Sequence, residues 1–122
     1  MLFITKKTTG RLTEAHIEPD MCACYATPQG FSAVTSRAIL LINDNKLIVL
    51  FLNLFSTKVV QKIEFRMADL QEQTYNSSID PLTAVWSFNH QSQRWKFRIL
   101  KKILTLGSMQ GEFLSYLQRN IL

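Results

Sequence analysis

The amino-acid sequence predicts a mainly β domain that ends in one α-helix. Short runs of β-branched and aromatic residues recur between turn residues from position 21 to position 99, which is the pattern of short antiparallel strands. Residues 109–122 instead repeat apolar side chains at helical spacing. With 122 residues, 47% of them hydrophobic, the chain can close one core. We therefore expect a single domain over residues 1–122.

The first half of the chain predicts four strands joined by turns. Pro28-Gln29-Gly30 and Asn43-Asp44-Asn45 are typical of tight turns, and the runs around them are rich in small, branched or aromatic residues. The expected strands are residues 21–27, 31–35, 38–42 and 46–55. Residues 1–19 allow either a strand at 2–5 or a helical turn at 13–17, and both options stay open.

The second half of the chain predicts further strands before the helix. Residues 59–67 alternate between apolar and charged side chains, as in a strand with one face in water. The expected strands are residues 59–67, 70–75, 83–88 and 94–99, with loops at 76–81 and 89–93. The last two strands form the clearest hairpin, because Trp86 and Phe88 match Trp95 and Phe97 as same-face pairs.

The final helix, residues 109–122, has one apolar stripe. Ser108 before it is the expected N-cap, because a serine hydroxyl accepts a hydrogen bond from the first free N–H groups of a helix. The stripe consists of Phe113, Leu114, Leu117 and Ile121, whereas Gln110, Ser115, Gln118 and Arg119 lie outside it.

The order of these elements resembles the pleckstrin-homology superfold, in particular its bacterial and GRAM-like branches. In those branches a glycine opens a strand, a threonine with a polar neighbour ends it, and a basic residue with an aliphatic run begins the next. The segment Gly30-Phe31-Ser32-Ala33-Val34-Thr35-Ser36-Arg37 and the run 38–42 are similar to that motif. The family's usual arginine–leucine pair would fall on positions 38 and 39, so Arg37 stands one position early.

The resemblance covers about residues 20–122 and implies a PH-like barrel of two near-orthogonal antiparallel sheets, with the helix capping one open end. It also favours a non-catalytic interaction module. Phosphoinositide pockets in such domains draw basic residues from the first strands and their loop. The equivalent loop here, residues 27–30, has no basic residue, so we do not expect that ligand.

A row of cations is the sharpest local feature of the sequence. In the strand near Trp95, the side chains of Arg94, Lys96 and Arg98 point to one face, and Lys101 and Lys102 follow directly. We expect this surface to bind a protein partner or an anionic lipid surface. The alternative is an ordinary charged edge strand that resists aggregation.

Magnitudes and geometry limit what this basic surface can bind. Each cation near an anionic leaflet contributes about 1 kcal/mol, so charge alone gives at best sub-millimolar binding to a membrane. Nucleic-acid modules usually carry aromatic and basic side chains on the same face. The alternation of Trp95 and Phe97 with the cations separates them, which makes nucleic-acid binding only an alternative.

The strand expected at residues 46–55 is apolar on both faces. A small barrel buries one face, so the second is covered by another part of the chain or by a second copy. We expect self-association through Val49, Phe51, Asn53 and Phe55, and internal cover is the alternative.

Catalytic and metal-binding groups are sparse, and we expect neither an enzyme nor a cofactor. The two histidines are His16 and His90, and the alternative of a small metal-dependent enzyme would need one of them. The spacing of Glu14, His16, Glu18 and Asp20 suits weak metal binding at most. Cys22 and Cys24 point to the same face of one strand, so we expect reduced, buried thiols.

The location expected from the sequence is cytoplasmic, with peripheral attachment to the inner face of the membrane as an extension. Lys6 and Lys7 follow a short apolar start, so a signal-peptide core is missing. The longest apolar run, residues 47–52, is far too short to span a bilayer.

Overall fold

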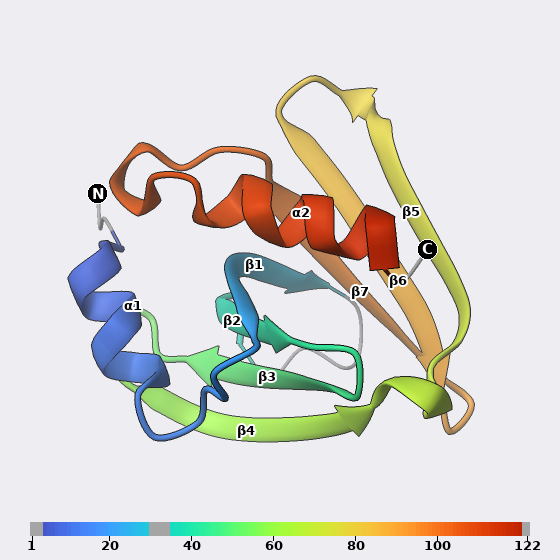
Figure 1. Cartoon of the computed structure of the whole chain (residues 1–122), viewed down its shortest axis with the longest axis horizontal. Helices are drawn as coiled ribbons and strands as arrows, with labels where there is room; N and C mark the ends of the chain where they lie inside the picture. Colours follow the sequence, from blue (N-terminus) through green and yellow to red (C-terminus); the bar gives the residue numbers. More distant parts are fainter. Residues whose placement is uncertain (1–3, 30–34, 121–122) are drawn as a thin grey trace.

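The chain forms a mainly β structure with a helix near each end (Figure 1). The computed structural model describes residues 4–29 and 35–120, without the side chain of Ile79. The helices are α1 (Lys6–Thr13) and α2 (Met109–Asn120), and two single turns of 3₁₀ helix are η1 (Met67–Asp69) and η2 (Leu104–Leu106). The strands are β1 (Cys22–Gln29), β2 (Ala38–Ile42), β3 (Lys46–Leu52), β4 (Val59–Arg66), β5 (Gln71–Asp80), β6 (Thr83–His90) and β7 (Gln93–Leu100).

The strands form one antiparallel sheet in the order β4-β3-β2-β1-β7-β6-β5. β1 belongs to both parts of the sheet, because residues 22–26 pair with β2 and residues 27–29 pair with β7. β4 and β5 stand at the two ends of this order and are not paired with each other, so the sheet is not closed. In Figure 1, β5 and β6 run steeply past the nearly horizontal β4.

β3 is buried on both faces by the chain itself. Its residues Leu47, Val49 and Phe51 belong to a large core that β6, β7 and α2 complete. The other face, formed by Ile48, Leu50 and Leu52, is covered by residues of α1, η2 and the segment before α1, including Ile4, Leu12 and Leu106. Strands covered on both faces are apolar throughout, which explains the composition of this segment.

The predicted self-association surface is therefore wrong in part. Val49 and Phe51 have no exposed surface in one chain, so a second copy does not reach them. Asn53 lies beyond β3, where its Oδ1 accepts hydrogen bonds from Thr57 N (2.8 Å) and Lys58 N (3.1 Å) and closes the turn to β4. Phe55 lies in the same turn and is 58% exposed. Internal cover, the alternative, is what the structure has.

Most predicted strands are found, and three boundaries are corrected. β3 ends at Leu52 instead of at residue 55. β1 continues through Pro28 and Gln29 instead of turning, and both pair with β7. Proline is tolerated there because the pairing of β1 with β2 has already ended at Ala26, so no ladder partner needs the missing N–H. Residues 76–80 are strand instead of loop, held by their pairing with β6. The expected strand at 31–35 falls mostly on residues 30–34, which lie outside the described residues.

The open question at the N-terminus resolves into a helix. α1 begins after Thr5, whose Oγ1 accepts a hydrogen bond from Thr8 N (3.2 Å) as an N-cap. Its buried residues include Leu12, and Arg11 Nη2 donates to the Thr57 carbonyl (2.9 Å). The expected helical turn at 13–17 thus overlaps only the end of the helix. Of the strand option, residues 2 and 3 lie outside the described part of the chain.

None of the helices in the described ranges has the length and hydropathy needed to cross a bilayer. The longer of the two helices, α2, has 12 residues.

Candidate binding site

β7 alternates as predicted. Trp95, Phe97 and Ile99 are buried, while Arg94, Lys96 and Arg98 are exposed on the opposite face. The turn before β7 is tight because Gln91 and Ser92 both adopt positive φ, 51° and 64°, as two-residue hairpin turns require. Because Trp95 and Phe97 lie in the core, they are not available to stack on bases, which removes the aromatic half of a nucleic-acid surface.

The five predicted cations do not form one patch. Arg94 lies across the outer face of β6 and β5, where it donates hydrogen bonds to Ser87 Oγ (2.7 Å), the Glu72 carbonyl (2.9 Å), Asn89 Oδ1 (3.1 Å) and Thr74 Oγ1 (3.2 Å). This guanidinium ties the outer strands together. Its role in the described structure is thus one of bracing the sheet.

Lys96 and Arg98 border a small hollow of about 170 Å³ on the same face, together with Gln29, Asp80, Thr83 and Val85. The pKa of Asp80 is lowered, chiefly by the hydrogen bond from the Leu82 N–H and further by Thr83 and Arg98. An ionised carboxylate beside two cations offsets part of their charge. This surface is therefore less basic than the sequence predicts.

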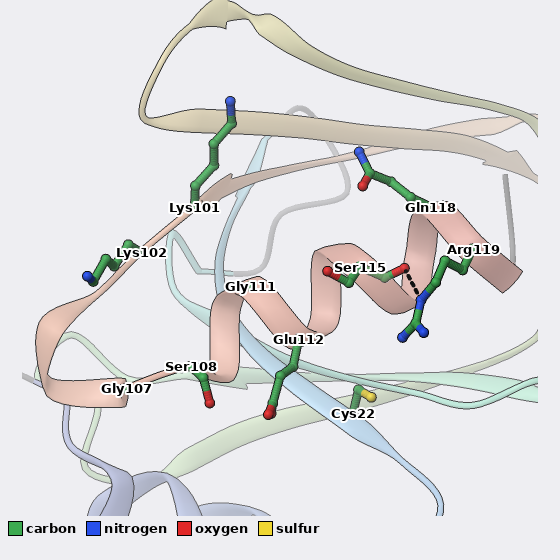
Figure 2. Close-up of a pocket in the computed structure, with 10 residues that line it drawn as sticks. All are labelled: Cys22, Lys101, Lys102, Gly107, Ser108, Gly111, Glu112, Ser115, Gln118 and Arg119. Atoms are coloured by element: carbon green, nitrogen blue, oxygen red, sulfur yellow. Dashed lines mark hydrogen bonds between the residues drawn. The ribbon is translucent and has the colours of Figure 1, made fainter.

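Lys101 and Lys102 lie on a different surface, at a larger hollow of about 1000 Å³ beside α2 (Figure 2). Residues of the loop before α2 and of its exposed side line most of it. The lining residues are Cys22, Lys101, Lys102, Gly107, Ser108, Gly111, Glu112, Ser115, Gln118 and Arg119. We call this feature the α2 hollow.

The position of α2 is fixed by a buried side chain, Gln110, which is fully inaccessible to solvent. The pairing of β1 with β7 ends at Thr27 and Arg98. If the two strands continued to pair in the same register, Tyr25 would lie opposite Leu100. The strands separate there, and the Gln110 amide fills the gap. Its Oε1 accepts from Tyr25 N (2.7 Å), and its Nε2 donates to the carbonyls of Tyr25 (2.9 Å) and Leu100 (2.8 Å). The amide replaces a missing peptide group of the ladder.

A second contact holds the other half of α2. The Tyr116 hydroxyl donates a hydrogen bond to Asp44 Oδ1 in the turn between β2 and β3. Burial and this neighbouring carboxylate raise the pKa of Tyr116 to about 12. Gln110 and Tyr116 together hold α2 against β1 in one orientation, so Gly111, Ser115 and Gln118 consistently line the hollow.

Three cations and one carboxylate set the charge of the α2 hollow. Lys101 Nζ donates to the Ser77 carbonyl (2.8 Å), and Arg119 Nε donates to the Ser115 carbonyl (3.3 Å), which places both charges at the rim. Lys102 lies next to Lys101 near the start of α2 and points outward, whereas Arg119 lies near the other end of the helix (Figure 2). Among the lining residues that lie in the described part of the chain, Glu112 is the only one with a carboxylate. The net charge of these side chains is therefore positive.

The loop that begins the hollow depends on a glycine. Gly107 ends η2 with a φ of 61°, a left-handed conformation in which any other residue is strained. A side chain there would also meet Lys6, because a Cβ atom at Gly107 would come 2.7 Å from Lys6 Cε. The amine of Lys6 therefore lies beside the hollow and adds to its positive charge.

Cys22 is half-buried at the floor of the hollow, and Cys24 is fully buried in the core. Both thiols are free, and they share a face as predicted. Burial raises the pKa of each thiol, and Glu112 raises that of Cys22 further, more than Arg119 lowers it. At neutral pH Cys22 is therefore a protonated, weakly nucleophilic thiol.

The structure corrects the predicted surroundings of His90. It ends β6 opposite Gln93 and is half-buried, with its ring edge against Phe65 at a centroid distance of 4.8 Å. The solvated loop that the sequence predicts is shorter, because the hairpin turns tightly at positions 91 and 92.

Two residues of the predicted weak metal cluster make other contacts. Glu18 pairs with Lys46 (2.7 Å), and Asp20 accepts a hydrogen bond from Asn43 Nδ2 (3.1 Å). Within residues 4–29 and 35–120, no group of three or more His, Cys, Asp and Glu side chains is arranged to hold a metal ion.

The α2 hollow and Gln110 could not be identified from the helical pattern. Gln110 lies outside the apolar stripe, and only a structure shows that its position faces the gap between β1 and β7. The part of the hollow that the sequence does indicate is the adjacent pair Lys101 and Lys102, which was predicted as a cationic surface. Comparison with protein-family models and with curated proteins finds no match to this sequence.

Proposed function

We propose that this chain is a non-catalytic, PH-like binding module that takes an acidic segment of a partner protein into the α2 hollow. The observation that carries the proposal is the concave, cationic surface beside α2, where Lys101, Lys102 and Arg119 line the hollow together with glycine and serine residues. No histidine lies among the lining residues, and Cys22 is a poor nucleophile, which favours binding over catalysis.

The PH-like arrangement is supported by the strand order and by the ring contacts of Phe65. In this meander the first strand pairs with the last, and β4 and β5 do not pair with each other. A partly open barrel with two near-orthogonal sheets requires this order. Phe65 of β4 also packs edge-on against Phe88 of β6 and Trp95 of β7, at centroid distances of 5.4 and 5.0 Å. These contacts pack β4, at one end of the strand order, against β6 and β7 in one core, and α2 packs on the same core.

Charge alone gives this site little affinity. An exposed ion pair contributes about 0.2–1 kcal/mol, so three of them supply at most about 3 kcal/mol, weaker than a millimolar complex. Seating a chain segment inside the concavity adds buried contact area, which a flat bilayer cannot reach to the same depth. The hollow therefore suits a protein segment, and its charge selects an acidic one.

The proposal is tested with a fluorescently labelled oligoglutamate peptide and measurement of anisotropy. We expect binding that weakens with salt and falls at least tenfold in the double variant Lys102→Glu/Arg119→Glu. The matched control is Lys96→Glu/Arg98→Glu, which makes the same charge change on the other face and should leave binding within about twofold. Equal loss in both double variants, or no binding to the unaltered chain, would contradict the proposal.

A second candidate, docking on an anionic membrane surface, is favoured by three exposed leucines. Leu82, Leu100 and Leu104 are 69%, 48% and 85% exposed, and the Lys101 N–H donates to the Leu82 carbonyl (2.8 Å), which places lysine and leucine together. A buried leucine side chain contributes about 1.5–3 kcal/mol and each lysine about 1 kcal/mol. Two leucines with two lysines would thus bind in the micromolar to millimolar range.

Vesicle sedimentation separates the two candidates. Membrane docking predicts sedimentation with vesicles that contain phosphatidylserine, none with neutral vesicles, and loss of binding in Leu82→Ser/Leu104→Ser. That variant should bind the peptide normally if the hollow takes an acidic segment, because neither leucine lines it.

A further inference from the structure

β4 presents a free sheet edge. It pairs with β3 on one side, and in the described structure no strand pairs with its other side. The opposite edge, β5, is irregular: its pairing with β6 shifts register twice, and Glu72 adopts a positive φ of 50°. Such bulges and twists protect an edge from adding strands. β4 shows one irregularity, at its start, and pairs regularly from Gln61 to Arg66.

The hydrogen-bonding groups on the free edge can be assigned. The Met67 N–H donates to the Asn45 carbonyl (2.9 Å), so this residue faces the β3 side. Backbone groups alternate in direction along an antiparallel strand. The N–H and C=O groups of Lys62, Glu64 and Arg66 therefore point outward from the sheet, and the side chains of these residues are also exposed.

We propose that β4 of a second copy of the chain pairs with this edge, antiparallel and centred on Ile63. In that register Lys62 faces Glu64 of the second copy, and Glu64 faces Lys62 of the second copy. The two facing pairs use only outward-pointing groups. This proposal is independent of the α2 hollow, which lies on other elements.

Charge favours this register over the two adjacent ones, in which the two-fold axis passes through Lys62 or Glu64. A two-fold axis through Lys62 would place Lys62 opposite its own copy, and one through Glu64 would place Glu64 opposite itself and Lys62 opposite Arg66. Like charges directly opposite each other destabilise strand pairing, and opposite charges stabilise it. Lysine on an edge usually prevents pairing, but here Lys62 and Glu64 alternate and complement a second copy of themselves.

The strength of the dimer follows from the number of backbone hydrogen bonds that the two β4 strands form. The two facing pairs exchange about four backbone hydrogen bonds. Phe55, Leu54 and Val60 are exposed beside the start of β4, at 58%, 62% and 47%, and the second copy would cover part of them. We expect reversible dimers at high micromolar concentration.

Charge exchange tests both the dimer and its register by sedimentation velocity. Lys62→Glu should be monomeric, because it places glutamates opposite each other, and Glu64→Lys should be monomeric for the corresponding reason. An equal mixture of the two variants should form dimers again, because each facing pair is then of opposite charge. Glu64→Lys also loses the ion pair with Lys46 (3.1 Å), so thermal melts establish that each variant is folded.

Cysteine trapping provides a second, independent readout. Facing residues of a hydrogen-bonded pair have Cα atoms about 5.5 Å apart, within the range that a disulfide spans. In a Cys22→Ser background, Lys62→Cys mixed with Glu64→Cys should cross-link under mild oxidation, and neither alone should do so efficiently. Cross-linking of one variant by itself would overturn the register, and a monomer at all concentrations with no cross-link would overturn the dimer.

Discussion

Replacing Gln110 by methionine isolates the energy of its hydrogen bonds, since methionine nearly preserves the buried volume. Three hydrogen bonds, to Tyr25 N, Tyr25 O and Leu100 O, are lost in this variant. At about 1 kcal/mol each, with a further 1–3 kcal/mol for leaving a buried N–H without a partner, the free energy of unfolding should fall by about 4–6 kcal/mol. That is a large part of the stability of a domain this size.

Urea denaturation followed by tryptophan fluorescence measures this loss. With an m-value of about 2 kcal/mol/M in urea, the unfolding midpoint of Gln110→Met should fall by about 2–3 M. Gln110→Glu should be destabilised at least as much at neutral pH, because a carboxylate cannot donate to the two carbonyls, and should recover partly in acid when it gains a proton. Gln118→Ala, an exposed position on the same helix, is the matched control and should stay within about 0.5 kcal/mol. If Gln110→Met is as stable as that control, the amide does not replace the missing ladder contacts.

Three further predictions follow from single side chains. Gly111 lies on the exposed side of α2 with no atom within 4 Å of an added Cβ, so Gly111→Ala should raise the free energy of unfolding by about 0.5–1 kcal/mol, and a loss of stability in urea would show a hidden contact. The raised pKa of Tyr116, about 12 against 10.0, favours the neutral phenol in the folded chain. Its contribution is therefore complete below pH 10 and lost as pH rises toward 12, so the stability advantage over Tyr116→Phe should vanish across that interval. Maleimide should label the folded chain slowly at Cys22 and leave Cys24 unmodified, since Cys24 is fully buried, and mass spectrometry of Cys22→Ser should find no label before unfolding.

The parts of the fold that sequence patterns predict are those in which one local rule decides the structure. β2 and β7 are found at or near their expected bounds, because the apolar and polar residues of each strand match its buried and exposed positions. The turn at Asn43 is also predicted correctly: its Oδ1 accepts from Asn45 N (2.9 Å) and Lys46 N (2.8 Å). These contacts are local, so composition and spacing are sufficient.

Other elements depend on distant partners. α1 contains threonines and a glycine, which are weak helix formers, and it is held by the packing of Leu12 and by the Arg11 contact with Thr57. The strand character of residues 76–80 comes from β6. Pro28 extends a strand because β7 replaces β2 as its partner. No pattern within these segments encodes those partners.

The candidate site was predicted only in part for the same reason. The sequence places five cations close together in the chain, but strand direction sends Arg94 across β5 and β6, while Lys101 and Lys102 leave the sheet and meet α2. Which cations share a surface depends on where β7 ends and on how Gln110 orients α2. Both are tertiary properties.

The proposed binding in the α2 hollow is tested most directly by NMR titration with the oligoglutamate peptide. Gly107 and Gly111 both line the hollow, and glycine amide signals resolve well, while Gly10 in α1 is an internal reference. The amide signals of Gly107, Gly111 and Ser115 should shift in proportion to occupancy, and those of Gly10, Lys96 and Arg98 should stay in place. Shifts centred on Lys96 and Arg98, or none at saturating peptide, would contradict the assignment of the binding site.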